Sequence, residues 1–94
     1  MVIGVSYKAD LQKTKQVLRA TLEKDPRILK DPDMTIGVLA LADSSVNFVV
    51  RPWVKTEDYW GVYFDSMQAI KEALDANGIE IPFPQMDVHL NKLD

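Results

Sequence analysis

The stretch that decides the fold is Met34-Thr35-Ile36-Gly37-Val38-Leu39-Ala40-Leu41-Ala42-Asp43-Ser44-Ser45-Val46-Asn47-Phe48-Val49-Val50-Arg51-Pro52-Trp53-Val54, in the middle of the chain. Residues 34–41 and 46–54 are both rich in β-branched and large apolar side chains, which favour extended backbone. The four residues between them, 42–45, have the composition of a turn. We therefore predict a β-hairpin, with Pro52 near the end of its second strand, where a missing backbone donor is tolerated.

A helix is predicted before the hairpin. Asp10 offers an N-cap oxygen to a helix that begins at Leu11, and the helix ends near Lys24-Asp25-Pro26 because proline disfavours helical geometry at the residue before it. The spacing predicts one apolar stripe on this helix. Its members are Leu11, Thr14, Val17, Leu18, Thr21 and Leu22.

A longer helix is predicted after the hairpin. Thr56 is the expected N-cap, and Glu57 and Asp58 suit the positive end of the helix dipole. Gly78 is the expected stop, because glycine takes the left-handed conformation without steric cost. The predicted buried stripe consists of Trp60, Tyr63, Phe64, Met67, Ile70 and Leu74.

Strands are predicted at both ends of the chain. Residues 1–7 alternate as a short strand, with Ile3, Val5 and Tyr7 on one face. At the other end, Pro82 and Pro84 fix the backbone and remove two donors, so residues 81–85 should be extended with little pairing of their own. Residues 86–90 then alternate strictly between apolar and polar side chains.

The complete order is strand, helix, strand, strand, helix, strand, which is an α+β fold, the ferredoxin-like β-α-β-β-α-β sandwich. We predict a ferredoxin-like α/β domain over residues 1–81 and a proline-pinned tail with an assembly strand over residues 82–94. A strand held away from its own sheet has unpaired edges and needs a partner, for which another copy of the chain is the nearest candidate. The predicted intersubunit residues are Pro84, Gln85, Met86, Asp87, Val88, His89 and Leu90.

Composition indicates a small folded unit. A chain of 94 residues holds one core, and 47% hydrophobic with 27% charged residues is ordinary for a globular protein. The net charge of −3 gives no reason to expect binding to nucleic acid or an anionic membrane, and the lack of cysteine excludes disulfides and sulfur-based zinc sites. No apolar run approaches the roughly 18–20 residues of a membrane span. Because the chain begins inside a predicted strand, we expect it to be a segment of a longer protein.

Two segments together carry a resemblance to a known family. They are Leu41-Ala42-Asp43-Ser44-Ser45-Val46-Asn47-Phe48-Val49-Val50-Arg51-Pro52-Trp53 and Gly78-Ile79-Glu80-Ile81-Pro82-Phe83-Pro84-Gln85. With support from residues 3–10 and 27–32, the chain resembles the C-terminal cytoplasmic domain of the small-conductance mechanosensitive channel family, MscS.

The resemblance implies a cage-forming part of a homoheptameric channel of the bacterial inner membrane, opened by membrane tension to release solutes during osmotic downshock. It implies that transmembrane helices and a β domain precede this domain in the same parent chain, so that the membrane is reached only through that N-terminal part. It also implies that the last strands of the subunits form a barrel at the base of the cage, which matches residues 86–90. The expected partners are other copies of the chain.

An enzyme is the first competing interpretation. Asp43, Ser44, Ser45 and His89 supply the residue types of a nucleophilic triad, but the chain has no Gly-x-Ser-x-Gly elbow. A turn explains the serines and the aspartate better. We therefore predict that the domain is not an enzyme and needs no cofactor.

Metal and nucleic-acid sites are the other competitors. Asp87 and His89 give two ligands on one strand face, where a metal needs three or more, although a symmetric barrel would multiply them. Phe48 and Trp53 fall on opposite faces by parity, which does not suit the stacking of bases on a sheet. A free-standing ferredoxin-like module for ligand sensing or self-assembly is the alternative to the channel domain.

Overall fold

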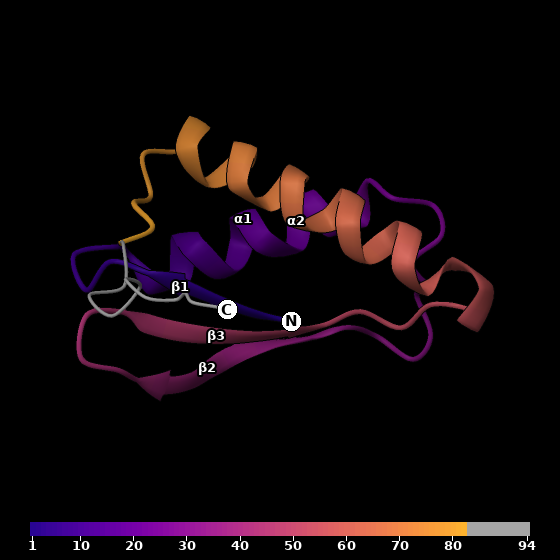
Figure 1. Ribbon diagram of the computed structural model, residues 1–94, viewed down its shortest axis with the longest axis horizontal. Helices are drawn as coiled ribbons and strands as arrows, with labels where there is room; N and C mark the ends of the chain where they lie inside the picture. The colour runs from indigo at the N-terminus through magenta and orange to yellow at the C-terminus, as the bar shows by residue number, and fades with distance from the viewer. Residues whose placement is uncertain (83–94) are drawn as a thin grey trace, which may run out of the picture.

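The computed structural model describes residues 1–82, which form two helices on one face of a three-stranded antiparallel sheet (Figure 1). The elements are β1 (Val2–Val5), α1 (Leu11–Glu23), β2 (Thr35–Leu41), β3 (Val46–Arg51), the 3-10 turn η1 (Thr56–Asp58) and α2 (Tyr59–Ala76). In the sheet β3 lies between β1 and β2. This order confirms the predicted mixed α/β fold and its central hairpin. The predicted last strand, residues 86–90, lies outside the described residues.

The register of the sheet divides its side chains between two faces. The rows that face the helices are Ile3–Phe48–Val38 and Val5–Val46–Leu41. The rows on the opposite face are Val2–Val49–Gly37 and Gly4–Asn47–Ala40. Phe48, at the centre of the first set, is completely buried. The register of β2 against β3 shifts between Val38 and Ala40, so Leu39 is the extra residue of a bulge.

The predicted limits of α1 are confirmed. The carboxylate of Asp10 accepts a hydrogen bond from the Lys13 backbone N–H at 3.1 Å, which is the N-cap contact that the sequence predicts. The side chains that α1 buries are Thr14, Leu18 and Leu22. Leu11 lies at the exposed margin of this stripe.

At the two ends of α2 the prediction is right once and wrong once. Gly78 has φ of 70°, and the next N–H, of Ile79, donates to the carbonyl of Leu74 at 2.9 Å, so the helix ends as predicted. Thr56 is not the N-cap. It lies in η1. The residue before α2 is Asp58, whose backbone is helical (φ −97°, ψ −2°) and whose side chain makes no capping hydrogen bond.

The predicted buried face of α2 needs a larger correction. The residues that α2 buries are Val62, Ser66, Ile70 and Leu74. Ile70 and Leu74 were predicted, whereas Trp60, Phe64 and Met67 are exposed. The physical reason is volume: α2 packs against α1, and the small side chains at 62 and 66 allow that close approach, while Trp60 and Phe64 stay exposed.

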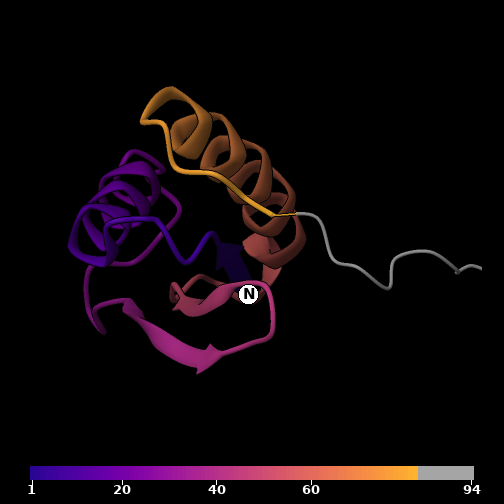
Figure 2. The same ribbon diagram turned by 90° about the vertical axis from the view of Figure 1, so that its left-hand side faces the viewer.

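Beyond α2, residues 79–81 return to the sheet. Ile79 is buried, Ile81 is half-buried against the core, and the Ser6 N–H donates to the Glu80 carbonyl at 2.8 Å. Figure 2 shows this last coloured segment descending from the end of α2 toward the sheet. The chain therefore reaches Pro82 beside the C-terminal end of β1. Within residues 1–82, no helix has the length and apolarity needed to cross a membrane.

Candidate assembly surface

An aromatic cluster covers the outward side of α2 in its first three turns. We call it the aromatic face, and it consists of Tyr59, Trp60, Tyr63, Phe64 and Met67. Trp60 stacks on Phe64 with ring centroids 5.8 Å apart, and it meets Tyr59 and Tyr63 edge-on at 5.0 and 5.7 Å. Tyr63 in turn meets Phe64 edge-on at 5.7 Å. The rings therefore form one connected surface.

The exposure of this surface is the feature that calls for a partner. Trp60 and Phe64 each keep 62% of their area in solvent. Large apolar patches on a folded domain mark interaction sites, and aromatic residues and methionine are enriched where proteins meet. The rings contact one another along the helix, but their outer surfaces are not covered by any other part of residues 1–82. The aromatic face is thus a candidate contact surface.

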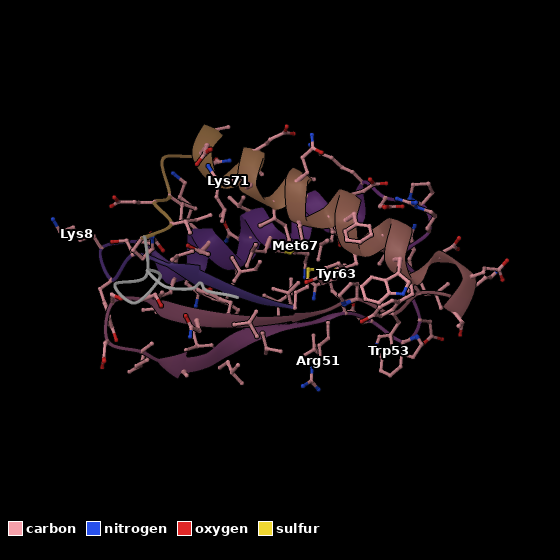
Figure 3. The ribbon with its side chains drawn as sticks, in the orientation of Figure 1. Lys8, Arg51, Trp53, Tyr63, Met67 and Lys71 are labelled. Carbon is pink, nitrogen blue, oxygen red and sulfur yellow. The ribbon has the colours of Figure 1, made fainter. Side chains whose placement is uncertain are left out.

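A pocket adjoins the aromatic face at the start of α2. It has a volume of about 370 Å³, and its lining residues are Met1, Val50, Arg51, Pro52, Trp53, Val54, Tyr59, Val62 and Tyr63. Figure 3 shows Tyr63 on α2 and Trp53 on the segment that follows β3. Trp53 is 52% exposed, so the apolar surface continues from α2 past the pocket to the end of the sheet.

The loop after α1 holds this end of the domain in place. The Leu29 N–H donates to the Trp53 carbonyl at 2.8 Å, and Ile28 forms a bridge with Val54. Arg27 then ties the loop to α2, since its Nη2 donates to Asp65 Oδ2 at 2.8 Å and to Asp25 Oδ2 at 2.7 Å.

Electrostatics reinforce this tie. Hydrogen bonds from Arg27, through its side chain and backbone N–H, lower the pKa of Asp25. The two carboxylates, Asp25 first, raise the pKa of Arg27, so the guanidinium stays charged. Arg27 also lies close to Gly61, where an added methyl group would approach its Nη1 to 3.0 Å. Through these contacts with Asp65 and Gly61, the loop after α1 holds the part of α2 that carries the aromatic face.

A second exposed surface, of mixed composition, lies on the other side of the domain. We call it the outer sheet face, and it consists of Val2, Gly4, Thr35, Gly37, Leu39, Ala40, Asn47, Val49 and Arg51. The helices cover only the opposite face of the sheet (Figure 1). Val2 and Leu39 are each 54% exposed. Arg51, the one charged residue of this set, projects away from the helices in Figure 3.

The residues considered for a nucleophilic triad do not come together in the described part of the chain. Ser45 donates its hydroxyl to Asn47 Oδ1 at 2.7 Å, and the Ala42 N–H donates to the Ser45 carbonyl at 2.9 Å, which closes the predicted turn. Asp43 and Ser44 lie in the same turn, whereas His89 lies outside residues 1–82.

The aromatic pair weighed for base stacking is also separated, because Phe48 is in the core and Trp53 is exposed. Residues 1–82 hold no cluster of three or more histidine, cysteine or acidic side chains suited to a metal ion. The predicted intersubunit residues 84–90 lie outside the described residues, and so does the histidine of the proposed ion contact, His89.

Sequence reasoning missed the aromatic face because it assigned these rings to the core. The sequence does contain a signal that these rings lie outside the core. Between residues 59 and 67, α2 has apolar side chains at 59, 60, 62, 63, 64 and 67, which is more of the circumference than one packed stripe uses. An apolar circumference wider than one stripe indicates that part of it stays outside the domain's own core.

These two exposed faces lie on an α+β sandwich and are candidate contact surfaces. The sequence of residues 1–81 matches the family described as "Mechanosensitive ion channel MscS, C-terminal". This chain belongs to that family.

Relatives and a solved structure agree with this assignment. A small-conductance mechanosensitive channel from Edwardsiella ictaluri is 53% identical over 96% of this chain and 32% of its own length. An MscS family protein from Archaeoglobus fulgidus is 40% identical over 89% of this chain and 30% of its own length. The crystal structure of Helicobacter pylori MscS in its closed state matches 99% of this chain and 37% of that chain, with a TM-score of 0.84 and 34% identity. The chain thus spans about a third of the length of the relatives it matches.

Proposed function

We propose that this chain is the cytoplasmic, cage-forming assembly domain of a mechanosensitive channel of the bacterial inner membrane, which releases solutes under tension during osmotic downshock. The observation that carries the proposal is the exposed aromatic face, in which Trp60 and Phe64 are uncovered. The chain belongs to the MscS family and spans about a third of the length of its relatives. The pore would lie in the remaining part of the parent chain. The role of this domain is to bring subunits together, and it catalyses no reaction.

The experiment compares the full-length protein with this chain alone in membrane patches. The full-length protein should give tension-gated current, and the 94-residue chain should give none. Reproducible single-channel steps from the chain alone would refute the proposal that the pore lies in another part of the parent chain. A full-length protein that reaches the membrane and passes no current under tension would refute the channel assignment.

We also propose that residues 82–94 form a tail whose strand joins the subunits of a heptamer, separate from the domain over residues 1–81. Support comes from the alternation of Met86, Val88 and Leu90 behind the two prolines at 82 and 84. The described chain delivers Pro82 to the end of the sheet beside β1, where Ser6 holds Glu80.

The test of the tail is Val88→Asp in the full-length protein, with Asp87→Asn on the polar face of the strand as the control. Native mass should fall for Val88→Asp and stay unchanged for Asp87→Asn. Hydrogen exchange of residues 86–90 should lose protection in the same variant. Unchanged mass and protection in Val88→Asp would exclude an intersubunit strand.

A further inference from the structure

The aromatic face and the outer sheet face are two different unpartnered surfaces of one small domain. Both helices pack on one side of the sheet, so the aromatic face of α2 and the outer sheet face cannot cover each other within one chain (Figure 1). A two-fold dimer needs only one self-complementary patch. Two unlike patches on one subunit are what a ring of subunits joined head to tail requires.

The two surfaces differ in the size of their side chains. The outer sheet face has small residues at its β2 side, where a methyl group added at Gly37 would meet no atom within 4 Å and Ala40 is exposed. Leu39, the extra residue of the bulge, is the neighbour of Ala40 in β2 and is 54% exposed. The aromatic face, in contrast, carries large side chains, among which Trp60 stacks on Phe64. Large rings on one surface and small residues at 37 and 40 on the other are the size relation that a close contact between the two surfaces would use.

The two surfaces are complementary in charge. Arg51 is exposed on the outer sheet face, and Glu57 is exposed one turn before Trp60 at the edge of the aromatic face. Neither takes part in any of the ion pairs formed among residues 1–82. Opposite charges across an interface fix its register and exclude the reversed orientation.

We propose that the aromatic face of one copy docks on the outer sheet face of the next copy, with Glu57 near Arg51 of the neighbour. This inference rests on the proposed assembly function and names the counterpart of the aromatic face. It predicts that Phe64 of one subunit lies against Gly37 of another.

Because residues 1–94 contain no cysteine, introduced cysteines report this contact without background from the domain. The experiment uses the full-length protein, with any cysteines outside this domain replaced, under mild oxidation and non-reducing electrophoresis. Phe64→Cys with Gly37→Cys in one chain should give a ladder of cross-linked species. Each single variant should give none, and neither should the control pair Phe64→Cys with Gln16→Cys, since Gln16 is exposed on α1.

Three results would overturn the docking. Dimers from Phe64→Cys alone would show that two aromatic faces meet each other. A ladder from the control pair equal to that of the test pair would show random collision. No ladder from the test pair, in a protein whose native mass and tension-gated current are unchanged, would show that another part of the parent protein or the membrane covers the aromatic face. In that last case the proposed function stands and only the docking fails.

A charge exchange provides an independent arm. Arg51→Glu should weaken association about tenfold or more, because it sets two like charges against each other at the interface. Adding Glu57→Arg to the same chain should restore association, since the pair is then reversed. If the second substitution weakens association further, Glu57 and Arg51 do not meet and the proposed register is wrong.

Discussion

The two faces of α2 follow the prediction only in part: Ile70 and Leu74 are buried as expected, whereas Trp60 and Phe64 are exposed. The inner face carries Val62, Ser66, Ile70 and Leu74, and the outer face carries Tyr59, Trp60, Tyr63, Phe64 and Met67. Trp60 and Phe64, which are among the bulkiest side chains of the helix, are thus mostly left in solvent. The difference indicates that volume, as well as hydrophobicity, decides which side of a helix is packed, and an exposed apolar surface of this kind is typical of an interaction site.

The comparison assigns separate tasks to the two faces. Leu74 is completely buried, so its contacts exist only in the folded domain and stabilise the fold. Phe64 is mostly in solvent before and after folding, so it contributes little to the stability of the fold, and the proposed association is what would bury it. Substitutions on the two faces should therefore separate folding from assembly.

The largest effect on folding is expected at Leu74. Leu74→Ala removes a side chain with no solvent exposure and leaves a cavity, so the free energy of unfolding of this chain should fall by about 2–5 kcal/mol. Urea unfolding followed by circular dichroism measures the loss. A loss below about 1 kcal/mol would mean that the inner face of α2 is not the packed one.

A smaller effect is expected at the C-terminal end of α2. Gly78→Ala places a Cβ at φ of 70°, and the free energy of unfolding should fall by about 1 kcal/mol. The added methyl group meets open space, so the backbone conformation alone accounts for the cost. Gly37→Ala, also in open space but without positive φ, is the matched control and should change stability less. Equal effects at the two glycines would contradict the left-handed stop.

A still smaller effect is expected on the aromatic face. Phe64→Ala should lower the free energy of unfolding by less than about 1 kcal/mol, because a mostly exposed side chain leaves no cavity. This expectation replaces the interpretation of Phe64 as a core residue. A loss as large as that of Leu74→Ala would show that the outer face is packed in the folded chain after all.

The smallest effect is expected from pH at the loop that orients α2. Because Arg27 lowers the pKa of Asp25 in the folded chain, this carboxylate stabilises the fold above its unfolded pKa near 4 and loses that contribution as the pH falls through the folded pKa. Arg27→Gln should therefore flatten the decline in stability between pH 5 and about pH 2. Arg51→Gln removes a charge that has no ion-pair partner within residues 1–82 and serves as the control. Parallel pH profiles for the protein and Arg27→Gln would rule out the coupling.

Much of the fold follows from local sequence signals. The hairpin, the cap at Asp10 and the stop at Gly78 depend on a few neighbouring residues, and each was predictable for that reason. The start of α2 was not, because Thr56–Asp58 form a 3-10 turn and the residue types there suit such a turn as well as the first turn of a helix. Local sequence preference does not decide between these two conformations.

The candidate site was harder to predict than the fold. Periodicity finds the apolar side of a helix but does not count partners, so Trp60 and Phe64 were assigned to the same stripe as Leu74. The outer sheet face depends on the pairing register and the bulge at Leu39, which are long-range features. The tail over residues 84–90 stays a prediction, since it lies outside the described residues.

The most direct test of the account measures folding and assembly in the same variant. Trp60→Ser with Phe64→Ser removes the stacked rings of the aromatic face without touching the inner face. Urea unfolding of this chain and native mass of the full-length protein are compared with those of Leu74→Ala. We predict that the double variant keeps its free energy of unfolding within about 1 kcal/mol while the full-length protein loses its assembled mass, because aromatic anchors carry interface energy. A double variant that unfolds as easily as Leu74→Ala, or that assembles to the unchanged mass, would contradict the claim that the aromatic face is an assembly surface.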